Sequence, residues 1–68
     1  MDIQLIKKEF DQFAKFYKER NLKLAFLSLE KILKENPNQT EAIFFSGILY
    51  VQIKNFKEAK NYFLKLIK

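Results

Sequence analysis

An uncharged stretch in the second half of the chain places the strongest limit on its fold. Residues Ala42 to Ile53 read AIFFSGILYVQI, and none of them carries a charge. In a helix, the apolar side chains of this stretch point to every side, and a helix that is apolar all round is a buried helix. We therefore expect a central helix here, covered on all sides by the other helices of the chain.

The size of the chain predicts a single domain over residues 1–68. A domain of about this size buries only about 60% of the surface that its unfolded chain exposes, so it needs a dense core or a partner. Hydrophobic residues make up 49% of the chain, with one Gly and one Pro. A membrane-spanning helix needs about 20 apolar residues, and the uncharged stretch is shorter than that. No secretory signal is readable at the N-terminus. We expect a cytoplasmic protein.

The composition argues against catalysis. The chain has no Cys and no His, which excludes disulfides, thiolate zinc sites, thiol nucleophiles and the commonest general base. A nucleophile at Ser28, Ser46 or Thr40 would need a Lys, Asp or Glu to activate it. The eight acidic residues form no pattern of metal ligands. We therefore expect no enzymatic activity, no cofactor, no metal and no small-molecule substrate.

Apolar residues at three- and four-residue steps predict three more helices, which makes the fold all-α. We expect them over Ile3 to about Lys18, Leu22 to Glu35 and Phe56 to about Ile67. Asn36 and Pro37 end the second of these helices, because the residue before a proline is pushed out of the helical region. With the uncharged stretch, this gives four helices.

Polar residues between the helices predict turns and caps. Asn tolerates left-handed backbone, so Asn21 is expected to close the first helix, and Asn55 occupies the equivalent place before the last one. Asn38 or Thr40 is expected to cap the uncharged helix. Gly47, inside that helix, predicts that another helix approaches it closely.

The second half of the chain repeats the pattern of the first half. Identical residues and conservative replacements recur at one constant spacing: Phe10 and Phe44, Phe16 and Tyr50, Arg20 and Lys54, Asn21 and Asn55, Leu22 and Phe56, Lys23 and Lys57, Ala25 and Ala59, Leu29 and Phe63, Lys31 and Lys65, Ile32 and Leu66, Leu33 and Ile67, and Lys34 and Lys68. This spacing is the period of about 34 residues, with two helices in each unit, that is typical of one class of repeat protein.

These residues resemble the tetratricopeptide repeat family. Gly47, Tyr50, Phe56, Ala59 and Phe63 match the family's pattern in order and spacing. The match departs from the pattern where Phe13 replaces a small residue, Ser46 a leucine and Ile43 an aromatic residue. The resemblance implies four antiparallel helices in two stacked helical hairpins, a short right-handed α-solenoid. Repeat one covers about 6–39 and repeat two about 40–68, the second being truncated.

The resemblance implies a binding groove on the first helix of each repeat. Its expected residues are mainly apolar, with a rim of Lys7, Lys18 and Glu41. Such a groove suits an amphipathic helix or an extended hydrophobic segment. The groove residues are Lys7, Phe10, Ala14, Tyr17, Lys18, Glu41, Phe44, Phe45, Ile48, Val51 and Gln52. An alternative that stays open is that Phe10, Phe44 and Ile48 only pack the two repeats together.

The last helix predicts a second contact surface. About three repeats are normally needed to bury a continuous core, so Tyr62, Phe63, Leu66 and Ile67 should be partly uncovered. We expect a second copy of the chain or another protein to cover them, which makes a homo-oligomer or an assembly scaffold the expected form of this protein-binding module. An alternative that stays open is that the chain is a fragment of a longer repeat array.

The positive charge leaves one alternative function. The formal net charge is +5, and Lys54 to Lys68 carry five lysines against one acid. A basic amphipathic helix of this kind can bind nucleic acid or an anionic membrane. We disfavour both, because the lysines are scattered and Arg, the residue suited to bidentate phosphate contacts, occurs once.

Overall fold

The computed structural model describes residues 3–67 and is all-helical over them, as predicted. It contains α1 (Ile3–Lys18), α2 (Leu22–Glu35), α3 (Thr40–Gln52) and α4 (Phe56–Leu66). These bounds agree closely with the periodicity of the apolar residues. Met1, Asp2 and Lys68 lie outside the described residues, and so does the match between Lys34 and Lys68.

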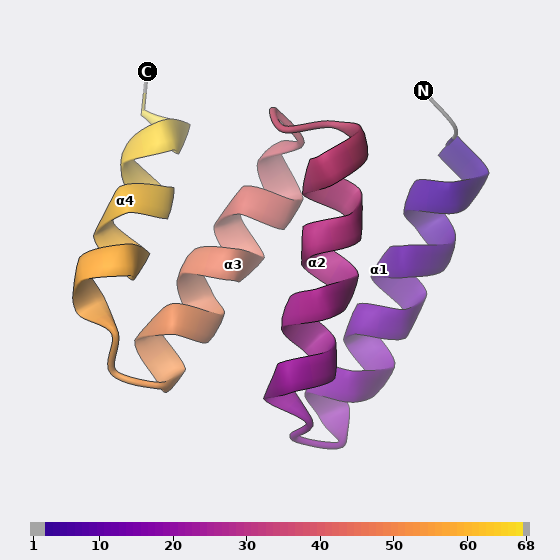
Figure 1. Ribbon diagram of the computed structural model, residues 1–68, viewed down its shortest axis with the longest axis horizontal. Helices are drawn as coiled ribbons and strands as arrows, with labels where there is room; N and C mark the ends of the chain where they lie inside the picture. Colours follow the sequence, from indigo (N-terminus) through magenta and orange to yellow (C-terminus); the bar gives the residue numbers. More distant parts are fainter. Residues whose placement is uncertain (1–2, 68) are drawn as a thin grey trace.

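The four helices pack side by side in chain order. α2 contacts both α1 and α3, and α3 contacts both α2 and α4 (Figure 1). The α1–α2 and α3–α4 turns lie at one end of the molecule, and the α2–α3 connection lies at the other (Figure 1). The Cα atoms extend over 31 × 30 × 13 Å, so the molecule is flat. A flat arrangement of this kind leaves large parts of the helices uncovered.

The core lies where α1, α2 and α3 meet. Its members come from the apolar faces of α1 and α2 and from one side of α3, and half-buried side chains such as Leu22 and Phe26 pack around them. Small side chains at helix contacts allow the axes to approach closely, and Ala25 and Ala42 are both fully buried. The buried cluster consists of Phe13, Ala25, Leu29, Ile32, Ala42 and Leu49.

The prediction that the uncharged helix is buried on all sides is wrong. α3 buries Ala42, Ile43 and Leu49, but Phe44 is 44% exposed and Val51 is 40% exposed. The reason is geometric, because α3 has helix neighbours on two sides and only the side chains of α1 near a third. The remaining side of α3 is therefore an apolar surface in contact with solvent.

Two turns of equivalent sequence have the same conformation. The left-handed residues are Arg20 (φ 61°) and Lys54 (φ 62°), not the asparagines that follow them. The N–H of Asn21 donates to the Phe16 carbonyl at 2.8 Å, and the N–H of Asn55 donates to the Tyr50 carbonyl at 2.8 Å. A bond that spans five residues around a left-handed residue closes a helix in the Schellman manner.

The asparagines of these turns begin the next helix. Asn21 Oδ1 accepts from the Leu24 N–H, and Asn55 Oδ1 accepts from the Glu58 N–H, each at 3.3 Å. An N-cap side chain of this kind satisfies a helix N–H that has no partner inside the helix. The expected left-handed role of Asn21 and Asn55 is therefore corrected to N-capping, and both residues have a negative φ.

The cap of α3 also differs from the prediction. Gln39 Oε1 accepts from the Ala42 N–H at 2.8 Å, so Gln39 is the N-cap. Thr40 is already the first helical residue. Asn38 lies one residue too early, and its N–H donates to Asn36 Oδ1. The side chain of Gln39 is long enough to reach the Ala42 N–H and cap the helix, although Asn38 or Thr40 was the expected N-cap.

Asn21→Ala and Asn55→Ala should each lower the free energy of unfolding by about 1 kcal/mol, since each removes one N-cap. Urea denaturation followed by circular dichroism measures the effect. Asn61→Ala is the matched control, because Asn61 is exposed inside α4 and alanine is the better helix former there. A loss in the control as large as in the two cap variants would contradict the capping role.

Candidate functional site

The eleven predicted groove residues all lie on α1, on α3 or at the ends of these helices, and none of them is buried. Phe10, Phe45 and Ile48 are half-buried, and the other eight are exposed. Phe10 and Phe45 pack against the core cluster, whereas the other residues of the set on α1 lie on its exposed side. Nine of them line three separate hollows, and Phe44 and Ile48 line none of these three.

Five of these residues line one depression between α1 and α3, which we call the aromatic hollow. They are Lys7, Phe10, Ala14, Glu41 and Phe45. The hollow has a volume of about 470 Å³, and its remaining lining comes from α1 and from the cap of α3. Those additional residues are Ile3, Ile6, Asp11, Phe13 and Gln39.

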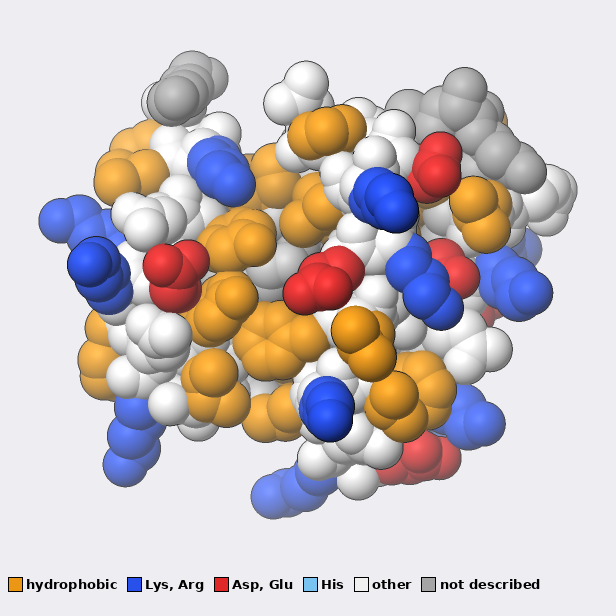
Figure 2. All heavy atoms as spheres, viewed as in Figure 1, with side chains coloured by type: hydrophobic (Ala, Val, Ile, Leu, Met, Phe, Trp, Pro, Cys, Tyr) orange, Lys and Arg blue, Asp and Glu red, His pale blue; other side chains and the backbone are white. Residues whose placement is uncertain are grey.

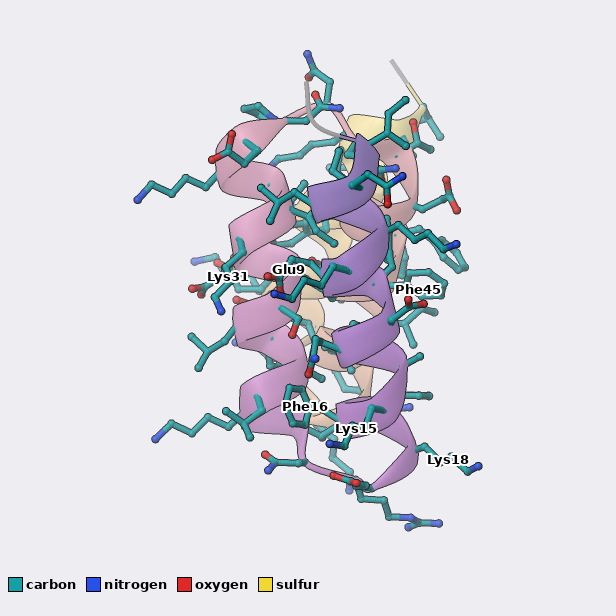
Figure 3. All side chains as sticks on the ribbon, turned by 90° about the vertical axis from the view of Figure 1, so that its right-hand side faces the viewer. Glu9, Lys15, Phe16, Lys18, Lys31 and Phe45 are labelled. Carbon is teal, nitrogen blue, oxygen red and sulfur yellow. The ribbon has the colours of Figure 1, made fainter. Side chains whose placement is uncertain are left out.

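Phe45 is the centre of the aromatic hollow. Its ring centroid lies 5.0 Å from that of Phe13, 6.3 Å from that of Phe10 and 5.7 Å from that of Phe44. Figure 3 shows Phe45 on one side of α1, with Glu9 and Lys31 on the other side. Aromatic pairs at these separations are favourable beyond the area that they bury. The ring cluster therefore forms a firm apolar floor.

Three further predicted residues line a second depression at the end of α1, which we call the turn hollow. Its residues are Tyr17, Lys18, Arg20, Leu22 and Gln52. The Gln52 Nε2 amide donates a hydrogen bond to the Tyr17 hydroxyl, which joins the last turn of α1 to the last turn of α3. This link was not predicted, because the sequence alone does not place two residues so far apart in the chain in contact.

A third depression lies along α4, and we call its lining the α4 edge. Of the four predicted self-association residues, Phe63 and Ile67 belong to it, and the predicted groove residue Val51 joins them. Phe56, which is 62% exposed, and Leu64 were missed. Their helical spacing from Phe63 and Ile67 was the signal that could have identified them. The α4 edge consists of Val51, Phe56, Ala59, Lys60, Phe63, Leu64 and Ile67.

Tyr62 lies on a different face of α4. Its ring stacks on Tyr50 at a centroid distance of 5.4 Å, and Tyr50 contacts Phe26 at 4.8 Å. Hydrophobic side chains gather over α3 between α2 and α4, with acidic side chains beside them (Figure 2). Burial raises the pKa of the Tyr62 hydroxyl, and Tyr50, Glu58 and Glu30 raise it further. The fourth predicted residue, Leu66, is half-buried.

The lysines of the last helix are exposed, and one of them contacts an aromatic ring. Lys57 and Lys60 are exposed, and Lys65 holds its ammonium group 4.6 Å from the centre of the Tyr62 ring. Among residues 3–67, no group of three or more acidic side chains could hold a metal ion. None of the helices that the structure describes is long and apolar enough to span a membrane.

Comparisons with family models, with curated proteins and with solved structures give no match to this chain. The resemblance to tetratricopeptide repeats therefore depends only on the residues of this sequence and on their spacing.

Proposed function

We propose that this protein is a polypeptide-binding module built from two tetratricopeptide-like helical hairpins. In this proposal α1 and α2 form the first hairpin and α3 and α4 the second, stacked as a short right-handed solenoid. The aromatic hollow binds an apolar or amphipathic segment of another protein. No catalytic step and no cofactor takes part.

The repeated turns support the two-hairpin arrangement. Arg20 and Lys54 occupy equivalent positions of the two repeats, and both close a helix with the same left-handed φ. The asparagines that follow them both cap the next helix. Two copies of one supersecondary unit are expected to repeat their turns in this way. The conformation of the turns thus recurs at the period of the sequence.

The uncovered aromatic rings carry the functional proposal. Phe44 is 44% exposed at the border of the ring cluster around Phe45, and Phe10 lines the hollow beside it. Burying apolar surface contributes about 25 cal/mol per Å², and aromatic side chains are enriched among the residues that dominate binding energy. An apolar side chain of a partner would therefore gain most of its affinity in this hollow.

The charged rim supports a preferred orientation of the bound segment. Lys7, Asp11 and Glu41 line the hollow together with the rings, and charges at the rim of an interface influence specificity and association rate more than affinity. A bound amphipathic segment would place opposite charges against them. Reversing one rim charge should change the association rate and its salt dependence more than the dissociation rate.

Selection of displayed random peptides against the immobilised protein tests the proposal. The enriched peptides should carry large apolar side chains at helical or alternating spacing, and fluorescence anisotropy should show saturable binding. Phe44→Ala should weaken binding about tenfold or more, which corresponds to about 1.4 kcal/mol.

Leu27→Ala is the matched control for this experiment. Leu27 has nearly the same exposure as Phe44, 43%, but it lies on α2 and lines a different hollow, beside Gln12 and Phe16. Its substitution should leave peptide binding unchanged. A selection without enrichment, or an equal loss in both variants, would refute the proposal.

A further inference from the structure

We propose that the α4 edge is a second docking site, which binds an amphipathic helix with acidic flanks from another polypeptide. This site is distinct from the aromatic hollow and needs a different partner segment. The evidence lies in the chain itself, because the first repeat carries the same surface in a covered state.

The surface that α1 and α2 offer to α3 recurs in the second repeat as the α4 edge. Leu22 and Leu33 of the first repeat are half-buried and pack against the core cluster. Their equivalents, Phe56 and Ile67, line the α4 edge and are 62% and 78% exposed. The α4 edge therefore has the form of a helix-binding surface that no described helix covers. We call the two equivalent surfaces seats: the first seat is the surface that α1 and α2 offer to α3, and the second seat is the α4 edge.

The residues that differ between the two seats identify the chemistry of the occupant. In the first seat Phe26 contacts the Tyr50 ring of α3. In the second seat the equivalent position is Lys60, which lines the hollow. Lys57 precedes it on the same exposed helix and Glu58 is half-buried. A helix docked in the manner of α3 would place the residue in Tyr50's register opposite Lys60, where a carboxylate pairs with the ammonium group.

A second copy cannot supply this helix head to tail. The residues of α3 that enter the core include Ala42, Phe45 and Leu49, and their equivalents in α1 are Lys8, Asp11 and Lys15. Burying these unpaired charges in an apolar seat is costly. Figure 3 looks onto α1, and Lys15 and Lys18 project from it. The face of α1 that holds Lys8, Asp11 and Lys15 is thus polar, whereas the α4 edge is apolar apart from Lys60.

A symmetric pair of α4 edges is also disfavoured. A two-fold axis brings each residue of the patch toward its own copy or toward a neighbour in the same patch. Apart from Lys60 this patch is apolar, so its ammonium group would face either the Lys60 ammonium group of the second copy or an apolar side chain, and no carboxylate. Like charges placed together across an interface are unfavourable. A helix that carries a carboxylate avoids this repulsion, because the carboxylate pairs with the Lys60 ammonium group.

Two labelled helical peptides of equal length and with the same apolar stripe test the proposal. One carries glutamate on both flanks of the stripe and the other carries lysine. Fluorescence anisotropy at low salt should show that the glutamate peptide binds about tenfold tighter or more. The difference should shrink as salt rises, because salt screens exposed charges.

Substitutions on both repeats locate the site. Lys60→Glu should reverse the preference between the peptides. Lys23→Glu is the matched control, because it changes the net charge equally but Lys23 lies on α2; it should leave the preference unchanged. Leu64→Ser should weaken both peptides without loss of helix content, since Leu64 is 44% exposed. Phe10→Ser should leave the preference for the glutamate peptide unchanged, because Phe10 lines the aromatic hollow and not the α4 edge.

Three results would overturn the inference. The first is equal affinity for both peptides, and the second is loss of binding in Phe10→Ser with none in Leu64→Ser, which would place the peptide in the aromatic hollow. The third is a native mass that rises with concentration in sedimentation equilibrium and stays monomeric in Leu64→Ser. That result would make a second copy the occupant of the α4 edge.

Discussion

Leu49→Ala should lower the free energy of unfolding by about 2 to 5 kcal/mol. Leu49 is fully buried on α3 and belongs to the same cluster as Phe13 and Leu29. Shortening the side chain there forfeits its burial and leaves a cavity that the neighbours fill only in part. Urea denaturation followed by circular dichroism measures the loss as a lower midpoint with an unchanged slope.

The small size of the domain makes this loss severe. Stabilities of about 0.05 to 0.15 kcal/mol per residue give about 3 to 10 kcal/mol for a chain of this length. Leu49→Ala is therefore expected to leave a measurable unfolded population in the absence of denaturant. Leu27→Ala makes the same chemical change at an exposed position of α2 and should cost less than about 1 kcal/mol. Equal losses at the two positions would show that Leu49 is not a core residue.

The helices were predictable because their signals are local. Apolar spacing marked α1, α2 and α4, and the pair Asn36-Pro37 marked the end of α2, so the observed bounds agree with the predicted ones. The caps were less predictable, since neighbouring polar residues compete for one task. Gln39 caps α3 although Asn38 and Thr40 are the commoner residue types, because only Gln39 has both the position and the reach.

The exposure of α3 could not be predicted from composition. A stretch without charges has no polar face, so its sequence does not say which side is left uncovered. The flat packing decides this, and it leaves Phe44 and Val51 exposed while Leu49 is buried. The same limit applies to the candidate sites. The sequence placed the groove residues on α1 and α3, but it did not divide them among three hollows or identify Phe56 and Leu64 on the α4 edge.

The internal repeat of the sequence was the more informative signal for long-range structure. It related turns that share one conformation, and it identified Ala25 and Ala59, both of which are buried. What it did not reveal is the difference between a covered seat and an uncovered one. Equivalent residues such as Leu33, which is half-buried, and Ile67, which is 78% exposed, have the same position in the repeat and different neighbours.

Gly47→Ala should destabilise the protein when Phe63 is present and stabilise the protein when Phe63 is replaced by alanine. A Cβ atom on Gly47 would lie 2.5, 2.7 and 2.9 Å from three atoms of the Phe63 ring. Overpacking of this kind costs about 1 to 3 kcal/mol. Alanine also gains about 1 kcal/mol over glycine inside a helix. With the ring present the cost exceeds the gain, and in a Phe63→Ala background only the gain remains.

A double-mutant cycle measures this coupling. The unfolding free energies of the original chain, Gly47→Ala, Phe63→Ala and the double variant should give an interaction energy of about 1 to 3 kcal/mol, in the range typical of residues in contact. Additive effects would mean that the Phe63 ring moves toward the uncovered α4 edge at no cost. In that case α3 and α4 would not require a small residue at their contact, and the match of Gly47 to the repeat pattern would lose its physical reason.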